Sequence, residues 1–228
     1  MTVDFDARQS RADMREDLRA ALLAAAARLI SEEGLGALAL RRLAERVNVS
    51  TKAVYTLFGG KEGLMEALYV HAFDGIASFE PEVLEIASPQ RRILELLRGY
   101  RRYALARPDL YAVMFGDAAM GLSPSAESRR HAWNTTRPMR QTLRECRPGM
   151  TAEEADFIMR ALWSAVHGIV SLELRQLIGG HDMANRLFDE SFTGLLRHFG
   201  VPFDRELLKD PALPLHPGPL PPRGGEGE

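Results

Sequence analysis

The stretch Leu40–Leu64, LRRLAERVNVSTKAVYTLFGGKEGL, decides how the N-terminal part of this chain folds. Its first part, Leu40–Val47, repeats apolar side chains at spacings of three, one and three, which places them on one side of a short helix. Asn48 tolerates the left-handed conformation that ends a helix, and Ser50 can cap a following helix by accepting a bond from a free backbone amide. The stretch therefore predicts two short helices around a tight turn.

The second helix is expected over Thr51–Phe58, with Val54, Leu57 and Phe58 on its buried side. A helix of this width enters the major groove of B-DNA, and its N-terminal residues reach the bases. An ordinary helical hairpin of an all-α protein would show the same pattern, so the residues that follow decide between the two. The opposite side carries hydrogen-bonding side chains suited to base edges and phosphates: Thr51, Lys52, Tyr55 and Thr56.

The continuation of the stretch favours DNA binding. Lys61 opens a third helix, where free amides and the helix dipole already attract phosphate, and its charge adds to that attraction. Gly59 and Gly60 precede it and let the backbone approach a partner closely.

Residues 49–64, VSTKAVYTLFGGKEGL, resemble the DNA-binding domain of the TetR/AcrR family of transcriptional regulators, and the likeness covers about Leu18–Leu68. The chain departs from the family pattern at Ala39, where the family has a capping threonine, and at Asn48, where it has glycine. The positions that match are Leu43, Ala44, Val49, Ser50, Tyr55, Phe58, Lys61, Glu62 and Leu64.

We predict two kinds of DNA contact from this segment. Arg41, Tyr55 and Lys61 are expected to bind phosphates, which positions the protein without reading sequence. Thr51, Lys52 and Thr56 are expected to reach base edges, with Lys52 able to pair with guanine and either threonine able to touch a thymine methyl. Ser50, as the cap of the reading helix, completes the predicted DNA-binding set.

Charge and composition bound the class of protein. The chain has 228 residues and a formal net charge of −2, from 29 basic and 31 acidic residues, which argues against a protein that coats nucleic acid broadly. Between Met14 and Lys61, 8 basic and 5 acidic residues leave a local excess of +3. The single cysteine, Cys146, excludes internal disulfides.

The sequence predicts a soluble, cytoplasmic protein. No apolar run approaches the ~18–20 residues of a membrane span. The N-terminus, MTVDFDARQ, lacks the basic start and hydrophobic core of a secretory signal.

The remainder of the chain predicts an all-α fold of about nine helices: an N-terminal three-helix helix-turn-helix domain and a C-terminal helical ligand-binding and dimerisation domain. We expect disorder at 1–11, the DNA-binding domain at 12–60, the helical domain at 61–200 with 61–78 connecting the two, and a disordered Pro/Gly-rich tail at 201–228.

Helices are expected at Asp13–Glu33, at Asp109–Phe115 and at Ser125–Arg147, the last kinked or split by Pro138. Two further helices are expected at Thr151–Gly179 and Ala184–Phe199, and Thr151 with Glu154 predicts a capping box at the start of the first.

Two segments of the C-terminal region, WSAVHGIVSLEL at 163–174 and RPDLYAVMFG at 107–116, resemble the WHG-type C-terminal domain of one TetR subfamily. The resemblance implies a homodimeric repressor that binds a palindromic operator, dimerises through 151–179 and 184–199, and is released by a small molecule. We assign no cofactor and no metal site. The candidates for lining an effector cavity, whose aromatic character points to a lipophilic effector, are Tyr103, Tyr111, Met114, Phe115, Met120, Trp133, Trp163 and His167.

Several alternatives stay open at the level of sequence. The aromatic and methionine side chains would leave the same pattern as plain core. His167 suits a hydrogen-bonded core histidine, a ligand contact or, least readily, a metal ligand. A helical ligand-binding or interaction protein without operator binding is the second function class, and an activator is an alternative to a repressor. An enzyme is disfavoured because the catalytic motifs HExxH and GxSxG and a complete phosphate-binding loop are missing.

Overall fold

Helices form all of the regular structure in the residues described by the computed structural model, 3–115 and 124–213. This confirms the predicted all-α class. The chain divides into two compact units, each described by itself below. The first contains the described residues of 1–73 and 109–131, and the second those of 74–108 and 132–219.

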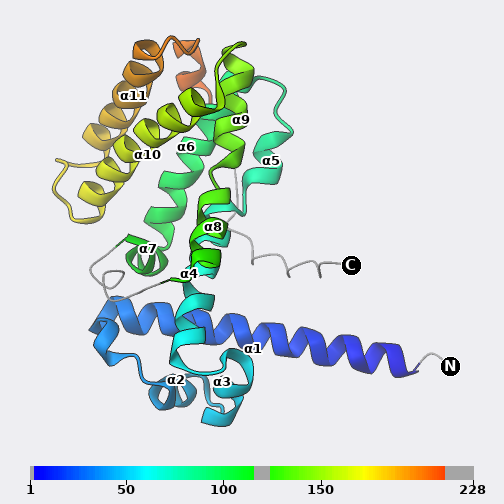
Figure 1. The fold of residues 1–228 in the computed structure, drawn as a ribbon. Helices are drawn as coiled ribbons and strands as arrows, with labels where there is room; N and C mark the ends of the chain where they lie inside the picture. The colour runs from blue at the N-terminus through cyan, green and yellow to red at the C-terminus, as the bar shows by residue number, and fades with distance from the viewer. Residues whose placement is uncertain (1–2, 116–123, 214–228) are drawn as a thin grey trace. The chain divides into compact units, whose positions relative to one another are not determined.

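The first unit is built on α1 (Val3–Glu33), against which η1 (Leu35–Ala37) and α2 (Leu40–Val47) pack. The helix α3 (Thr51–Phe58) packs on α2, and α4 (Lys61–Ala77) follows (Figure 1). The unit is completed by α7 (Pro108–Phe115) and the first part of α8 (Ala126–Asn134). Its core includes leucines and a valine that solvent does not reach: Leu22, Leu29, Leu43, Val54, Leu64 and Leu68.

The disorder predicted at 1–11 is contradicted over residues 3–11, which form the start of α1. This part of the sequence has no proline or glycine to stop a helix. Once the buried second half of α1 has nucleated the helix, each further residue adds a hydrogen bond at little cost.

The second unit consists of α5 (Glu80–Leu84), α6 (Pro89–Ala106), α9 (Arg137–Cys146), α10 (Ala152–Leu174), α11 (His181–His198) and the short η3 (Arg205–Lys209). The long helix α10 contacts α11, α9 and α6, and α6 also contacts α9 (Figure 1). A bundle of this kind buries the apolar stripe of each helix against its neighbours.

Several boundaries follow from local sequence signals. Thr151 accepts a bond from the Glu154 amide at 3.1 Å while Glu154 accepts one from the Thr151 amide at 2.8 Å, which confirms the predicted capping box. The expected helix Ser125–Arg147 is split into α8 and α9, with Pro138 in the first turn of α9.

Other boundaries differ from expectation. The helix α10 ends at Leu174 rather than at Gly179, because Gln176 already adopts a left-handed conformation (φ 57°). The next helix, α11, begins at His181 rather than Ala184. The structure also contains a short helix that the sequence did not predict, α5, with Pro81 in its first turn.

The predicted disorder at 201–228 is contradicted over residues 201–213, which run across α6. Arg98 and Arg102 donate to the carbonyls of Leu208 and Leu213 at 3.0 and 2.7 Å. The fully buried carboxylate of Glu95 accepts the Leu213 amide at 3.1 Å. A Pro/Gly-rich composition indicates that a segment lacks its own core, but it does not show whether another helix will bind its backbone.

The helix α10 is long and apolar enough to cross a membrane by length and composition, which contradicts the expectation that no segment approaches such a span. Arg160 and Glu173 interrupt the apolar run of this helix, but an average hydropathy over the helix tolerates both. The core helix of a soluble protein passes the same test. Ile158, Leu162 and Val166 bury one side of α10 in the helical bundle, so its apolar composition has a packing explanation.

Candidate nucleic-acid interface and effector region

The turn between α2 and α3 has the geometry predicted for it. Asn48 adopts the left-handed conformation (φ 57°, ψ 46°), and the Val49 amide donates to the Ala44 carbonyl at 2.9 Å. Ser50 accepts the Ala53 amide at 3.2 Å and so caps α3. These bonds hold the two helices in a fixed relation, which a reading helix requires.

The polar side of α3 faces solvent. Lys52 and Thr56 are exposed, Thr51 is half-buried, and Tyr55 leaves 54 % of its surface exposed although its ring is large and apolar. Thr56 donates its hydroxyl hydrogen to the Lys52 carbonyl at 2.9 Å, so that side chain offers a partner only its oxygen lone pairs and its methyl group. This face of α3 is therefore exposed and polar, and the DNA contacts of its residues stay a prediction.

The arginines of α2 are less available than their number implies. Arg42 forms a bidentate pair with Glu33, with bonds of 2.9 and 3.0 Å. Arg46 pairs with Glu32 at 2.8 Å. The Arg42 guanidinium also holds the pKa of the Glu33 carboxyl below its usual value, mainly through their hydrogen bond. The two glutamates at the end of α1 therefore offset much of the local basic excess.

Arg41, the predicted phosphate contact on α2, leaves 85 % of its side chain exposed and pairs with Glu45 one turn later at 3.0 Å. An exposed pair of this kind contributes only about 0.2–1 kcal/mol, so Arg41 can exchange Glu45 for a phosphate at little cost. Its placement is compatible with the predicted role.

Lys61 lies exposed at the first position of α4. The close approach of α4 to α3 depends on Gly63, a residue that the sequence patterns did not identify. A Cβ atom on Gly63 would lie 1.9 Å from the Phe58 carbonyl oxygen, so only glycine permits this close approach of α4 to the end of α3. No ion pair joins Lys61 or Lys52 to another residue within the described part of the chain. Both ammonium groups are therefore available to a polyanion.

In the second unit, three of the polar aromatic side chains meet. The Trp163 indole donates to the Tyr100 hydroxyl oxygen at 3.2 Å, and that oxygen lies 3.3 Å from Nδ1 of His167. Burial lowers the pKa of His167, which favours the neutral imidazole at neutral pH. Trp163 and His167, both candidates from the sequence, are four residues apart on one helix, but no local signal could identify Tyr100 on another helix.

The other predicted cavity residues are distributed over both units. Tyr103 of α6 packs against Gly75 of α4, where a Cβ atom would lie 2.2 Å from the tyrosine oxygen. Tyr111 and Phe115 of α7 are in edge contact at 5.2 Å, and Met114 beside them is buried. Packing accounts for these four positions, and their role as ligand contacts stays a prediction.

Two of the predicted cavity residues remain. Trp133 lies among positive charges, since the guanidinium carbons of Arg140 and Arg160 are 5.0 and 3.9 Å from its ring centre. Met120 falls outside the described residues. Among residues 3–115 and 124–213, no group of three or more His, Cys, Asp or Glu side chains is placed to hold a metal ion.

Comparison with known families covers both parts of the chain. Residues 22–68 match the family described as bacterial regulatory proteins, tetR family, and residues 93–199 match the tetracyclin repressor-like C-terminal domain. The chain belongs to the TetR family. The predicted class of helix-turn-helix regulator is thereby confirmed, as is the predicted TetR-type C-terminal domain.

Relatives of this TetR-family chain include the HTH-type transcriptional regulator BetI of Burkholderia thailandensis, which is 47 % identical over 58 residues. That match spans 25 % of this chain and 30 % of the relative, so the chain aligns with less than a third of that regulator's length. Among solved structures, the regulatory protein SCO4313 is 25 % identical with a TM-score of 0.67, covering 81 % of this chain and 98 % of that one.

FadR of Bacillus subtilis, solved in complex with stearoyl-CoA, has a TM-score of 0.59 at 15 % identity and covers 76 % of this chain and 97 % of its own. At that identity the likeness shows the fold alone.

Proposed function

We propose that this chain is a ligand-responsive transcriptional regulator that binds a palindromic operator as a homodimer and represses transcription until a small molecule releases it. The observation that carries the proposal is the exposed face of α3, where Lys52 and Tyr55 stand free of the core on a helix capped by Ser50. Lys61 at the start of α4 supplies a phosphate contact beside it. In this proposal 12–60 bind DNA, and 61–200 bind the effector and the second subunit.

The division of labour on the interface follows the predicted roles. Lys61, Tyr55 and Arg41 bind phosphates and set the register, while Thr51, Lys52 and Thr56 read base edges. Within this scheme Ser50 acts through its cap, and its hydroxyl hydrogen remains available to a phosphate because the cap uses only the oxygen as acceptor.

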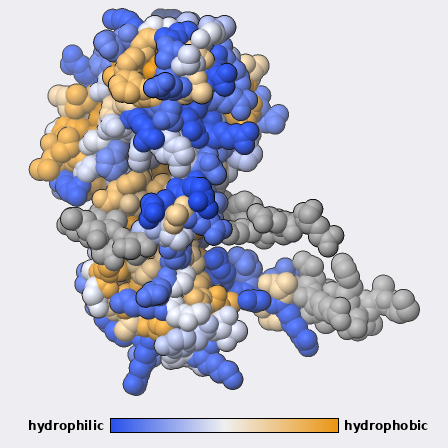
Figure 2. Space-filling view, viewed as in Figure 1, coloured by the Kyte–Doolittle hydropathy of each residue, from blue (hydrophilic) through white to orange (hydrophobic). Residues whose placement is uncertain are grey.

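Dimerisation through α10 and α11 is supported by apolar side chains that the single chain leaves exposed. Leu177, just after α10, is 68 % exposed, and Phe157 near the start of α10 is 62 % exposed. Figure 2 shows an apolar area over the end of α10 and the start of α11. Its exposed members are Leu172, Leu177, Met183 and Leu187. A contiguous apolar area of this kind is typical of a subunit interface.

The dimer proposal has a direct test. Leu177→Asp should weaken dimerisation in sedimentation experiments across a range of concentrations, since it places a charge in the proposed interface. Met14→Asp is the matched control, because Met14 is 59 % exposed on α1 in the first unit. Equal behaviour of the two variants would place the interface elsewhere.

We propose that the effector binds in the second region of the chain, with Trp163 and His167 among its contacts. His167, whose pKa burial lowers, and the Tyr100 hydroxyl form a polar pair between α10 and α6, whose buried side chains include Leu97 and Val166. A few polar groups among apolar side chains are the usual composition of a small-molecule site. FadR holds stearoyl-CoA on the same fold, so this fold accommodates a lipophilic ligand. Lipophilic compounds are therefore the first class of effector to screen. The proposed protein acts in the cytoplasm and is not an enzyme.

Selection of bound DNA from a randomised duplex library, at moderate salt with the full chain, tests the central claim. An enriched palindrome with half-sites about 34–36 Å apart, or a small multiple of that spacing, supports a dimeric operator-binding regulator. A folded dimer that enriches no sequence would instead support the alternative, a helical ligand-binding or interaction protein without operator binding.

A further inference from the structure

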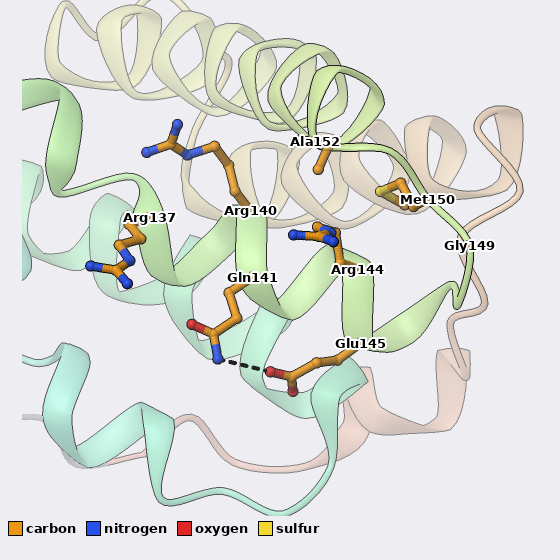
Figure 3. A pocket seen from close by; sticks show the side chains of 9 residues that line it. Arg137, Arg140, Gln141, Arg144, Glu145, Gly149, Met150 and Ala152 are labelled. Atoms are coloured by element: carbon orange, nitrogen blue, oxygen red, sulfur yellow. Dashed lines mark hydrogen bonds between the residues drawn. The ribbon is translucent and has the colours of Figure 1, made fainter.

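A groove of about 710 Å³ lies along α9 and the start of α10 in the second unit, and three arginines contribute to its lining (Figure 3). Arg137, Arg140 and Arg144 line it, together with Gln141 and Glu145 of the same helix. None of these five residues belongs to the proposed DNA interface or to the Tyr100–Trp163–His167 group.

The three arginines recur at intervals of three and four residues, which brings successive side chains onto neighbouring positions of one helix. Figure 3 shows Arg140 and Arg144 extending from α9 toward α10. Gln141 and Glu145, which also line the groove, point away from Arg140 and are joined by a hydrogen bond of 3.2 Å. Glu145, the acidic side chain of α9, therefore lines the groove but points away from Arg140.

Ion pairs within the protein satisfy only part of this positive charge. Glu145 forms an ion pair with Arg92 of α6. Arg140 pairs with Asp156 of α10 at 3.4 Å, but Arg160 shares the same carboxylate at 3.1 Å. One carboxylate thus serves two guanidinium groups.

Arg137 and Arg144 are both exposed and form no ion pair with any residue in the described part of the chain. In addition, Nε of Arg140 is buried and makes no hydrogen bond. Like charges one turn apart destabilise a helix, and a buried donor without a partner adds a desolvation penalty. The groove therefore holds more positive charge and more hydrogen-bond donors than the protein itself uses.

We propose that this groove binds a small ligand carrying two or more anionic groups, either carboxylates or phosphates. The planar guanidinium fork matches both oxyanions and forms paired, charge-assisted bonds with them. The volume lies within the range of small-molecule sites, which favours a metabolite-sized ligand. None of its residues belongs to the proposed operator interface, so a test of binding here does not depend on DNA recognition.

Calorimetric titration of the full chain with citrate and with inorganic pyrophosphate, at constant ionic strength set by sodium chloride, tests the proposal. We expect saturable binding of at least one probe, with one site per subunit. Arg144→Gln and Arg137→Gln should each weaken that binding by about tenfold or more, the usual effect of losing one charged hydrogen-bond partner. Arg144→Lys should fall between the wild type and Arg144→Gln, because it keeps the charge but loses the fork.

Arg28→Gln is the matched control, since Arg28 is an exposed arginine on α1 in the first unit and its loss changes the net charge equally. It should leave the binding unchanged. Binding of citrate alone would identify a carboxylate ligand, and binding of pyrophosphate alone a phosphate ligand; both outcomes support the site.

Failure of both probes to bind a correctly folded chain would overturn the proposal. So would an equal loss of affinity in Arg28→Gln, which would show a general charge effect. Because all of the substituted arginines are exposed, thermal unfolding of each variant should match the wild type and confirm that the comparison is valid.

Discussion

Replacing Lys61 with alanine should reduce the salt dependence of operator binding, whereas removing the Arg46–Glu32 pair should not. Lys61 is exposed at the start of α4 and has no ion pair among the described residues. Arg46 is bound to Glu32 at 2.8 Å, so this pair carries no net charge toward the DNA. The two changes therefore separate a free cation from a neutralised one within the same domain.

The magnitude follows from counterion release. Each phosphate contact adds about 0.9 to the slope of log affinity against log salt, so Lys61→Ala in both subunits should flatten the slope by about 1.8. Between 50 and 200 mM salt, the affinity difference between wild type and variant should then shrink by roughly tenfold. The double variant Arg46→Gln, Glu32→Gln should keep the wild-type slope.

Fluorescence anisotropy on the selected operator, at four salt concentrations between those limits, measures both slopes. An unchanged slope for Lys61→Ala would refute its role as a phosphate contact. A flatter slope for the double variant would show that Arg46 leaves Glu32 to bind phosphate. It would refute the conclusion that ion pairs with the glutamates of α1 keep the arginines of α2 from binding phosphate.

Three further predictions concern specificity, a buried charge and pH. Lys52→Ala should relax base preference at one or two positions in a repeated selection and weaken the cognate site by about 1–3 kcal/mol; an unchanged preference would rule out base reading by Lys52. Glu95→Gln should lower the free energy of unfolding by about 3 kcal/mol in urea titrations, because this fully buried carboxylate holds Arg91 and Arg98 at 2.9 and 3.2 Å. The exposed Glu206→Gln should change stability by less than about 0.5 kcal/mol, and a similar value for both variants would contradict this account. Burial raises the pKa of Glu80 from 4.5 to about 8, so the folded chain keeps a proton that the unfolded chain releases. Its contribution to stability should therefore fall as pH rises from 4.5 to about 8, and a thermal-unfolding profile with the same pH slope in Glu80→Gln would exclude this cause.

Local sequence rules were sufficient wherever neighbours along the chain decide the structure. Asn48 ends α2 in the left-handed conformation, Ser50 caps α3, and the Thr151–Glu154 box starts α10. Pro138 separates α8 from α9, as its missing amide requires. Each of these features depends on a side chain and a backbone group within four residues of one another, so spacing alone predicts it.

The candidate DNA surface could be predicted for the same reason. Its residues lie on one short helix and the start of the next, and helical periodicity separates the buried Val54 and Phe58 from the exposed Lys52 and Tyr55. The identity of the family followed from the same compact segment.

Only the tertiary structure decided which charges remain available and which side chains meet across the chain. Glu32 and Glu33 reach the arginines of α2 because α2 packs on α1, and Tyr100 reaches His167 because α6 packs on α10. Contacts between residues this far apart depend on how helices pack, a property of the whole bundle that no local spacing records.

The ordering of 201–213 shows the same limit. This segment has the composition of a disordered tail, yet Arg98, Arg102 and the buried Glu95 of α6 bind its backbone. The sequence alone predicted the helix-turn-helix, the caps at Ser50 and Thr151 and the face of α3 that meets solvent. The tertiary structure determined the partners of its charged groups, because the free energy of an ion pair or buried hydrogen bond depends on distance and burial in space rather than on position along the chain.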